Sequence, residues 1–183
     1  MKNSIFMIIV FVISSCNHPK KEENKNTSKV TKKELRPFFN SNKIDHYYLN
    51  FSDDEFTKFI SKDELTTKEE EFSDLFMGRF PDTIPKENFE KTLLNHNYKK
   101  KDLSTKQQNE IQNIFSEKDS LMDYGYACEA QYRDIFLFKN KEKTIGIAKI
   151  CFKCSRFQII GSKIDVSGFG KELGKLKKIV HSK

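Results

Sequence analysis

The sequence lacks a segment long and apolar enough to cross a membrane as a helix. Its longest unbroken apolar run covers residues 5–13, whereas a membrane-spanning helix needs about 20 such residues. It also lacks tryptophan, a Gly-rich phosphate loop, and the HExxH and GxSxG motifs of zinc proteases and serine hydrolases. A conventional membrane span is therefore excluded, and no catalytic motif of these classes supports an enzymatic activity.

The first sixteen residues are the most informative segment. Lys2 precedes the apolar run, and the tripeptide Ser14-Ser15-Cys16 follows it. A basic head, a short apolar run and small residues before a cleavage point are typical of an export signal. With Ile13, the tripeptide resembles the lipobox of a bacterial lipoprotein signal peptide. The resemblance implies cleavage before Cys16 and attachment of lipid to its sulfur.

A polar stretch follows the expected lipid attachment site. Residues 17–28 contain no large apolar side chain, and such a segment cannot bury enough surface to offset its loss of conformational entropy. We therefore expect a signal peptide at residues 1–15, a disordered tether at residues 16–42 and a single globular domain at residues 43–183.

The start of the tether also bears on location. Lys21-Glu22-Glu23 resembles the acidic export tag of surface lipoproteins in the Bacteroidota, and the Lys-, Asn- and Phe-rich composition without Trp fits that group. A plain solvated linker is the alternative. The resemblance implies membrane attachment through Cys16 in the bacterial outer membrane, with the domain facing the periplasm or the cell surface. Stable anchoring takes more than one acyl chain, which the di- or triacylated cysteine of this family would supply.

Charge is basic overall but dispersed along the chain. The formal net charge is +7, yet the acidic runs 53–55 and 69–71 interleave with the basic run 99–101. Interleaved charge is typical of a solvated surface, and an exported, lipid-anchored protein does not ordinarily meet nucleic acid. We therefore expect no nucleic-acid partner. The alternative is attraction of the basic groups to anionic lipid headgroups or to polysaccharide.

The first half of the domain is predicted to be a strand followed by helices. Aromatic and β-branched residues in 43–51 favour the strand. Three pairs have the spacing of a capping box, which satisfies backbone donors at a helix start: Ser52 with Glu55, Thr67 with Glu70, and Ser104 with Gln107. They predict helices over 53–61 and 67–79 and after Ser104. Pro85 suits the first turn of another helix, with Phe89, Leu93 and Leu94 on one face.

The second half is predicted to be mainly sheet. Residues 132–138 and 144–152 are β-rich and are joined by the polar loop 140–143, and a third strand covers 156–160. The first of these strands is apolar on both faces, which indicates a central position. A basic helix follows, with an apolar face. The order indicates an α+β fold with an antiparallel sheet of three to five strands and about four to five helices.

With Cys16 assigned to the lipid, Cys128, Cys151 and Cys154 remain, an odd number in an exported chain. The register expected for the hairpin places Cys128 one residue away from the position opposite Cys154. If the strand pairing shifts by one residue, Cys128 and Cys154 lie directly opposite each other. Cys151 would lie three residues further along, out of easy bridging reach. A disulfide between Cys128 and Cys154, worth about 3 kcal/mol, is therefore favoured, with Cys151 as the remaining thiol. Pairing of Cys128 with Cys151 stays open.

Three functional interpretations of these cysteines compete with the structural one. The CxxC at residues 151–154 lies between two predicted strands, whereas a thioredoxin-like pair needs a helix N-terminus. Covalent haem would need His directly after the CxxC, where the chain has Ser. A structural zinc site could use Cys128, Cys151 and Cys154 with His46 or His181, although the second CxxC of a zinc ribbon is missing. Residues 128–154 resemble an element of small Bacteroidota lipoproteins, which implies a shared fold element without an activity.

The remaining polar residues do not form a catalytic pattern. His46 lies in a predicted strand beside two tyrosines, so we expect a packed or hydrogen-bonded side chain. His96 lies where a helix should end and is explained by C-terminal capping. We therefore predict no catalytic or cofactor-binding residue and no cofactor. The expected function is non-enzymatic binding of an envelope protein or polysaccharide, and the alternative is a thiol-redox or zinc-binding envelope protein.

Overall fold

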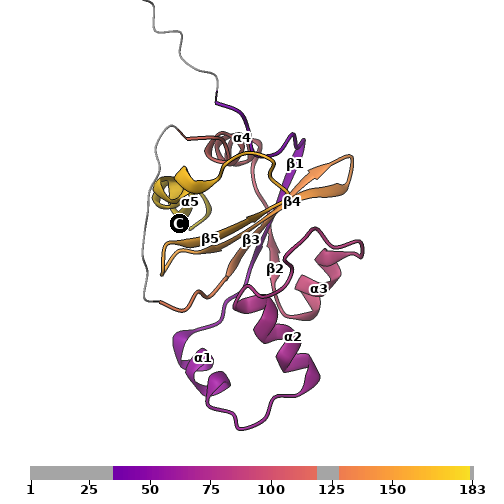
Figure 1. Ribbon diagram of the computed structural model, residues 1–183, viewed down its shortest axis with the longest axis vertical. Coiled ribbons are helices and arrows are strands. Elements are labelled where there is room, and N and C mark those ends of the chain that lie inside the picture. The colour runs from indigo at the N-terminus through magenta and orange to yellow at the C-terminus, as the bar shows by residue number, and fades with distance from the viewer. Residues whose placement is uncertain (1–34, 119–127, 182–183) are drawn as a thin grey trace, which may run out of the picture. The chain divides into compact units, whose positions relative to one another are not determined.

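The computed structural model describes residues 35–118 and 128–181, which belong to one compact unit beginning at Glu34. Within these residues, a five-stranded antiparallel sheet carries helices on both faces (Figure 1). The α+β class expected from the sequence is confirmed, and the numbers of strands and helices among these residues fall within the expected ranges.

Apart from one additional short strand at residues 99–101, the elements follow the predicted order along the chain. The strands are β1 (Lys43–Tyr48), β2 (Lys99–Lys101), β3 (Asp134–Asn140), β4 (Lys143–Cys151) and β5 (Arg156–Ile160). The helices are α1 (Asp53–Ile60), α2 (Thr67–Phe76), α3 (Phe89–Asn95), α4 (Thr105–Ile114), the 3-10 helix η1 (Ser167–Glu172) and α5 (Leu173–His181). The sheet order is β2-β1-β3-β4-β5, so β3 is central, as its apolar residues on both faces predicted.

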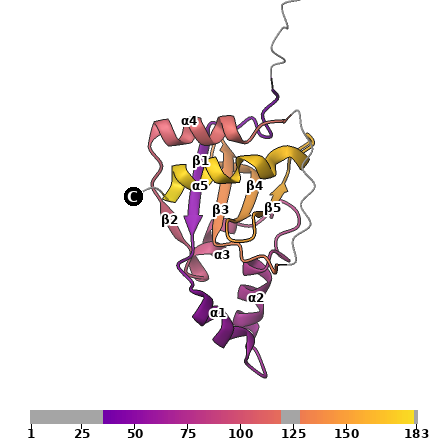
Figure 2. The ribbon, with the colours of Figure 1, turned by 90° about the vertical axis from the view of Figure 1, so that its left-hand side faces the viewer.

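Alternating side chains of β3 divide the core into two layers. Phe136 and Phe138 pack against α4, η1 and α5, which we call the α5 layer. Ile135 and Leu137 pack against α1, α2 and α3, which we call the α1–α3 layer. Figure 2 shows α4 and α5 next to each other over one face of the sheet. Burial on both faces, at about 25 cal/mol per Å² of apolar surface, explains why β3 carries an uninterrupted apolar run.

Three of the described helices start with a capping box, at or close to the residues that the sequence predicted. Ser52 and Ser104 are the N-caps of α1 and α4, as expected. The prediction for α2 was wrong by one residue, because its N-cap is Thr66, paired with Glu69, and not Thr67. Two adjacent threonines are followed by three adjacent glutamates in this segment, so both pairings have the required spacing. The spacing alone could not distinguish them.

Helix α3 is shorter than predicted. It begins at Phe89, after the N-cap Asn88, and not near Pro85. Its buried side chains are Phe89 and Leu93, whereas Leu94, expected on the same face, is 55% exposed. A helix of 7 residues presents only a narrow stripe of side chains to the core. Phe89 and Leu93, at positions i and i+4, form this stripe, and Leu94, the next residue, points away from it.

The folded domain begins before residue 43. Phe38 and Phe39, which fall in the predicted tether, are 5% and 3% exposed and belong to the core of the α5 layer. Phe39 packs on Phe138 with ring centroids 4.5 Å apart, in space left open by the absence of a side chain at Gly146. The tether boundary was therefore wrong for residues 35–42. Burial of two aromatic rings outweighs the entropy that this segment loses.

The predicted leader cannot be compared with the structure. The signal peptide at residues 1–15, the lipid attachment site Cys16 and tether residues 17–34 lie outside the described residues. Among the helices of residues 35–118 and 128–181, none is long and apolar enough to cross a membrane.

Two connections differ from the sequence prediction. Asn140 pairs with Lys143, so β3 and β4 are joined by a two-residue turn at Lys141 and Glu142, whose φ angles are 48° and 62°. The predicted loop of four residues was too long. Strand β2 was not predicted, because its three lysines are all exposed and show no apolar alternation. Charged side chains on an edge strand oppose pairing with a second chain.

Candidate functional site

A disulfide joins Cys128 to Cys154, which is the pairing that the sequence favoured. Their Cα atoms lie 6.0 Å apart, within the usual range for a disulfide. Cys128 precedes β3, and Cys154 lies in the turn between β4 and β5. The register near the hairpin turn matches the expected one, but a shift between Phe138 and Lys139 changes it further along. The two sulfurs meet beyond the paired residues of β3 and β4. The predicted pairing is therefore confirmed, but the hairpin register from which it was derived does not extend to these cysteines.

Cys151 keeps a free thiol, in contrast to the other two described cysteines. It ends β4, is 1% exposed and packs with Ala130, Tyr132 and Cys154 in a small apolar cluster. A thiol buried among apolar neighbours acts as a small hydrophobic side chain. Reaction with a partner in solution requires exposure, which Cys151 lacks.

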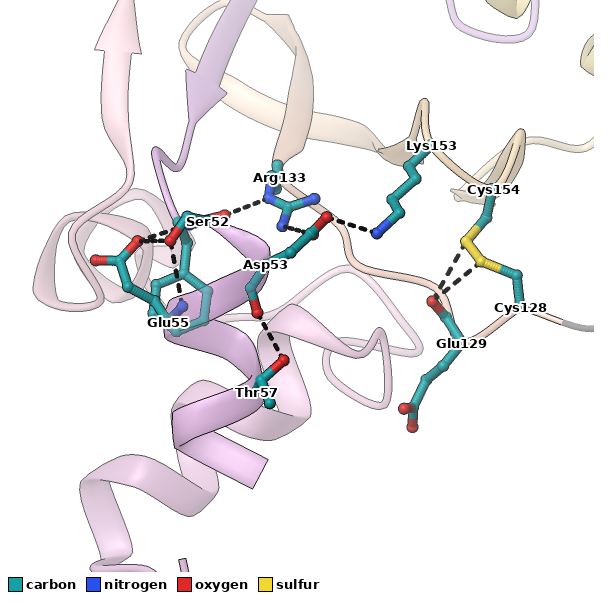
Figure 3. A network of polar contacts seen from close by, with 10 residues as sticks. Ser52, Asp53, Glu55, Thr57, Cys128, Glu129, Arg133, Lys153 and Cys154 are labelled. Atoms are coloured by element: carbon teal, nitrogen blue, oxygen red, sulfur yellow. Dashed lines mark hydrogen bonds and ion pairs between the residues drawn. A yellow bond between two sulfur atoms is a disulfide. The ribbon is translucent and has the colours of Figure 1, made fainter. Parts of the chain in front are cut away.

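An exposed ion network connects the β4–β5 turn to the start of α1, as Figure 3 shows. Lys153, within the CxxC, lies 2.7 Å from Oδ2 of Asp53, and Nη2 of Arg133 donates to Oδ1 of Asp53 at 3.0 Å. Lys153 and then Arg133 lower the pKa of Asp53. Exposed ion pairs add little stability, so this network orients the turn that carries the disulfide.

The two histidines considered as zinc ligands share the carboxylate of Asp134. Nε2 of His46 lies 2.8 Å, and Nε2 of His181 2.9 Å, from Oδ1 of Asp134. His46 also stacks on Phe136 with ring centroids 4.6 Å apart, which confirms the expected packed histidine. Burial alone would raise the pKa of Asp134, but hydrogen bonds from His181 and His46 hold it below its ordinary value. The cluster fastens the last turn of α5 to β1 and β3.

The zinc alternative has no assembled ligand set in the structure. Within residues 35–118 and 128–181, no group of three or more His, Cys, Asp or Glu side chains is arranged to hold a metal ion. Zinc binds cysteine as the thiolate, whereas Cys128 and Cys154 are oxidised in the disulfide. His46 and His181 contact Asp134.

A cavity of about 840 Å³ lies between residues 84–90 and 142–145. Glu90 in its wall accepts a hydrogen bond of 2.6 Å from the Tyr47 hydroxyl and pairs with Lys139. Lys139 also binds Oδ2 of Asp45 at 2.6 Å. Burial alone would lower the pKa of Lys139, but Asp45 and Glu90 raise it above its ordinary value. Lys100 also pairs with Asp45, at 2.7 Å, so two lysines balance the two carboxylates and the network is a structural element of the fold.

Lys149 is fully buried in β4 and fastens the chain after α2 to the sheet. Its Nζ lies 3.0 Å, 3.1 Å and 2.8 Å from the carbonyl oxygens of Gly78, Phe80 and Pro81. An ammonium group has three N–H donors, so each donor has an acceptor. Burial lowers the pKa of Lys149 to about 8, while Asp82 acts in the opposite direction. The side chain is 0% exposed and therefore has no access to a substrate.

A second cavity, of about 360 Å³, opens among α1, α2 and the end of α3. We name it the asparagine cavity because three phenylalanines and three asparagines line it: Phe51, Phe59, Phe72, Asn50, Asn95 and Asn97. The ring of Phe72 meets those of Phe51 and Phe59 edge to face, each with centroids 5.3 Å apart. In the described part of the chain, the three asparagine amides have no hydrogen-bond partner. Apolar walls with a few unpaired polar groups are typical of ligand sites.

His96 lines the asparagine cavity and two further hollows over α2 and α3. It is the C-cap of α3, as the sequence predicted, and is 5% exposed. Burial lowers its pKa; Glu71, whose Oε2 lies 3.6 Å from Nε2, acts against this shift, whereas Lys68 adds to it. Because the shift favours the neutral imidazole at pH 7, His96 presents the cavity with a hydrogen-bonding group that is uncharged.

Comparison with known proteins leaves the site to be interpreted from its own geometry. No known family, curated protein or solved structure gave a match.

Sequence reasoning did not find the asparagine cavity or the Lys149 site. Asn50 precedes α1, whereas Asn95 and Asn97 lie at and after the end of α3, and exposed asparagine is ordinary in loops. Lys149 did carry a signal, because it interrupts the apolar run of β4. A lysine within a buried strand requires acceptors nearby, although the sequence does not indicate which ones.

Proposed function

We propose that this protein is a lipid-anchored binding domain of the bacterial outer membrane that holds an envelope component in the asparagine cavity. The lipobox and tether support the location. The observation that carries the binding role is the set of three unpaired amides beside aromatic rings among the described residues. The three asparagines are exposed, so their amides can exchange hydrogen bonds to water for hydrogen bonds to a ligand in the cavity.

The other polar clusters support a non-enzymatic role. The carboxylates of Asp134 and Glu90 are hydrogen-bonded to side chains of the protein itself, and the ammonium group of Lys149 binds three backbone carbonyls. Groups engaged in this way fix the positions of helices and loops. The asparagine cavity instead offers neutral amides, which bind well but are poor proton-transfer groups or nucleophiles.

Replacing Cys16 with serine tests the anchor. In cells grown with labelled palmitate, Cys16→Ser should lose the label and move from the detergent phase to the aqueous phase on phase separation, because serine cannot form the thioether. The matched control is Cys151→Ala, which removes a different cysteine and should stay labelled. A Cys16→Ser protein that remains labelled in the detergent phase would refute lipid attachment at this residue.

Sedimentation with envelope material tests the binding role. Full-length protein in detergent should sediment with lipid-extracted envelopes of the source bacterium. In Asn50→Ala/Asn95→Ala the apparent Kd should rise about tenfold, as expected for the loss of one to two net hydrogen bonds. Asn109→Ala, an exposed asparagine on α4, is the matched control and should bind like the wild type. Equal sedimentation of the double variant, or no sedimentation of the wild type, contradicts the proposal.

A further inference from the structure

We infer that the ligand of the asparagine cavity is a neutral pyranose ring of an envelope polysaccharide. This inference rests on the proposed function and adds the chemical class of the ligand. A pyranose has an apolar face of C–H groups and a rim of hydroxyl groups, each of which can both donate and accept a hydrogen bond. The cavity contains partners for both parts.

The aromatic wall suits the apolar face of the sugar. Phe51 and Phe72 are half-buried, and Phe59 beneath them is 8% exposed. Their edge-to-face contacts hold the rings in fixed orientations, so a ligand would not need to order them. The face of an aromatic ring is electron-rich, and C–H groups of a sugar carry a small positive charge, so the contact is weakly attractive in addition to removing apolar surface from water.

The asparagine amides suit the hydroxyl rim. Each amide offers one oxygen acceptor and two N–H donors, which matches vicinal hydroxyls that donate and accept. Asn97 has a φ of 64°, a left-handed conformation that Asn tolerates better than most residues. Asn95 ends α3 and Asn50 follows β1, so two of the three amides lie beside regular elements that limit their movement.

The charges around the cavity favour a neutral ligand. Glu55 caps α1 through hydrogen bonds of 2.6 Å and 2.7 Å to Ser52. Glu69 caps α2 at Thr66 and pairs with Lys62. These carboxylates are occupied but still repel an anion. Lys68 is the one lysine among the described residues that line the cavity, so these two carboxylates outnumber it, and burial lowers the pKa of His96, which favours its uncharged form.

A peptide fits the cavity less well than a sugar. Extended peptides bind most simply by adding a strand to a sheet edge. The edge strands of the described sheet are β2 and β5, whereas the cavity is lined by residues of α1, α2 and the end of α3 and by the chain that follows β1. Its volume of about 360 Å³ is suited to a compact ring.

Titration with defined oligosaccharides tests the inference. The probes are neutral tetrasaccharides of glucose, galactose, mannose and N-acetylglucosamine, added to full-length protein in a detergent without a sugar headgroup. At least one should bind with a Kd of about 0.1–1 mM, and the Kd should change less than about twofold between low and high salt, because screening acts on charged pairs. Asn50→Ala/Asn95→Ala should weaken binding at least about tenfold, while Asn109→Ala should not.

A second measurement does not depend on any variant. Addition of the bound sugar should shift the imidazole NMR signals of His96, which lines the cavity. The signals of His46 and His181 should stay unchanged, since these residues lie in the α5 layer.

The outcomes separate this inference from the proposed function. The sugar assignment is wrong if no neutral sugar binds at a concentration of about ten times the expected Kd. It is also wrong if sugar binding leaves the imidazole NMR signals of His96 unchanged. A different result would keep the binding role: envelope material sediments the wild type but not the double variant, and no oligosaccharide competes for this binding. The ligand would then belong to another class, such as a peptide. If neither experiment detects binding, both proposals are wrong.

Discussion

Replacing Lys149 with methionine should lower the free energy of unfolding by about 3–5 kcal/mol, because three backbone carbonyl groups lose their donor. Methionine has a similar volume and no donor. The carbonyls of Gly78, Phe80 and Pro81 would each lose a hydrogen bond, and an unsatisfied buried acceptor is unfavourable by about 1–3 kcal/mol. Urea denaturation followed by circular dichroism measures the change.

The pH dependence of this loss has a definite sign. The folded pKa of Lys149 is about 8, below the value of about 10.4 for an unfolded lysine. Between these values the unfolded chain holds a proton that the folded protein has released, so the contribution of Lys149 to stability rises with pH. The difference between wild type and Lys149→Met should therefore widen from pH 7 to pH 10.

The matched control is Lys177→Met, an exposed lysine on α5. Its effect should stay within about 0.5 kcal/mol, as is usual for surface positions. A loss below about 1 kcal/mol for Lys149→Met would show that water or another donor serves the three carbonyls. A difference from wild type that does not vary with pH would show that folding does not lower the pKa of Lys149.

Removing the disulfide should have the second-largest effect. Cys128 and Cys154 are separated by 26 positions in sequence, and closing a loop of this length restricts the unfolded chain by about 3–4 kcal/mol on the loop-entropy model. Cys128→Ser/Cys154→Ser should lose stability in this range, as should the wild type in a reductant. Urea denaturation with and without the reductant makes the comparison.

Cys151→Ala is the control, and it tests the alternative thiol function as well. It removes a buried sulfur but leaves the disulfide in place, so only the modest effect of a small packing change is expected. Alkylation and peptide mapping of the wild type should give one linkage, Cys128 to Cys154, with Cys151 alkylated only after unfolding. Linkages that include Cys151 would favour thiol exchange, in which its thiolate attacks one sulfur of the disulfide and the other leaves as a thiolate.

Local features of the fold could be predicted because their causes lie within a few residues. The capping residues Ser52 and Ser104 act on backbone groups of their own helices. The apolar residues of β3 on both faces indicate its central position without knowledge of its neighbours. These predictions were confirmed, and the errors at Thr67 and Leu94 arose where two adjacent positions satisfied the same local rule.

Features that depend on distant pairings could not be predicted in the same way. Residue 134 lies 88 positions from His46 and 47 from His181, and nothing in the sequence indicates that one carboxylate serves both rings. The three asparagines of the cavity meet only because α1, α2 and α3 pack on the same face of the sheet. The disulfide was an exception, since the hairpin between its cysteines limits where they can lie.

If the chain is exported as we propose, the position of α5 affects the order of events during export. Leu173, Leu176 and His181 complete the α5 layer, so its core and the Asp134 cluster cannot form until residue 181 has been synthesised. A chain that carries an export signal must stay unfolded while it passes through the translocation channel, and late completion of the core favours this. A premature stop before α5 would remove Leu173 and Leu176 from the core of the α5 layer, and the apolar surface exposed in this way promotes aggregation, so the shortened chain should accumulate as insoluble material.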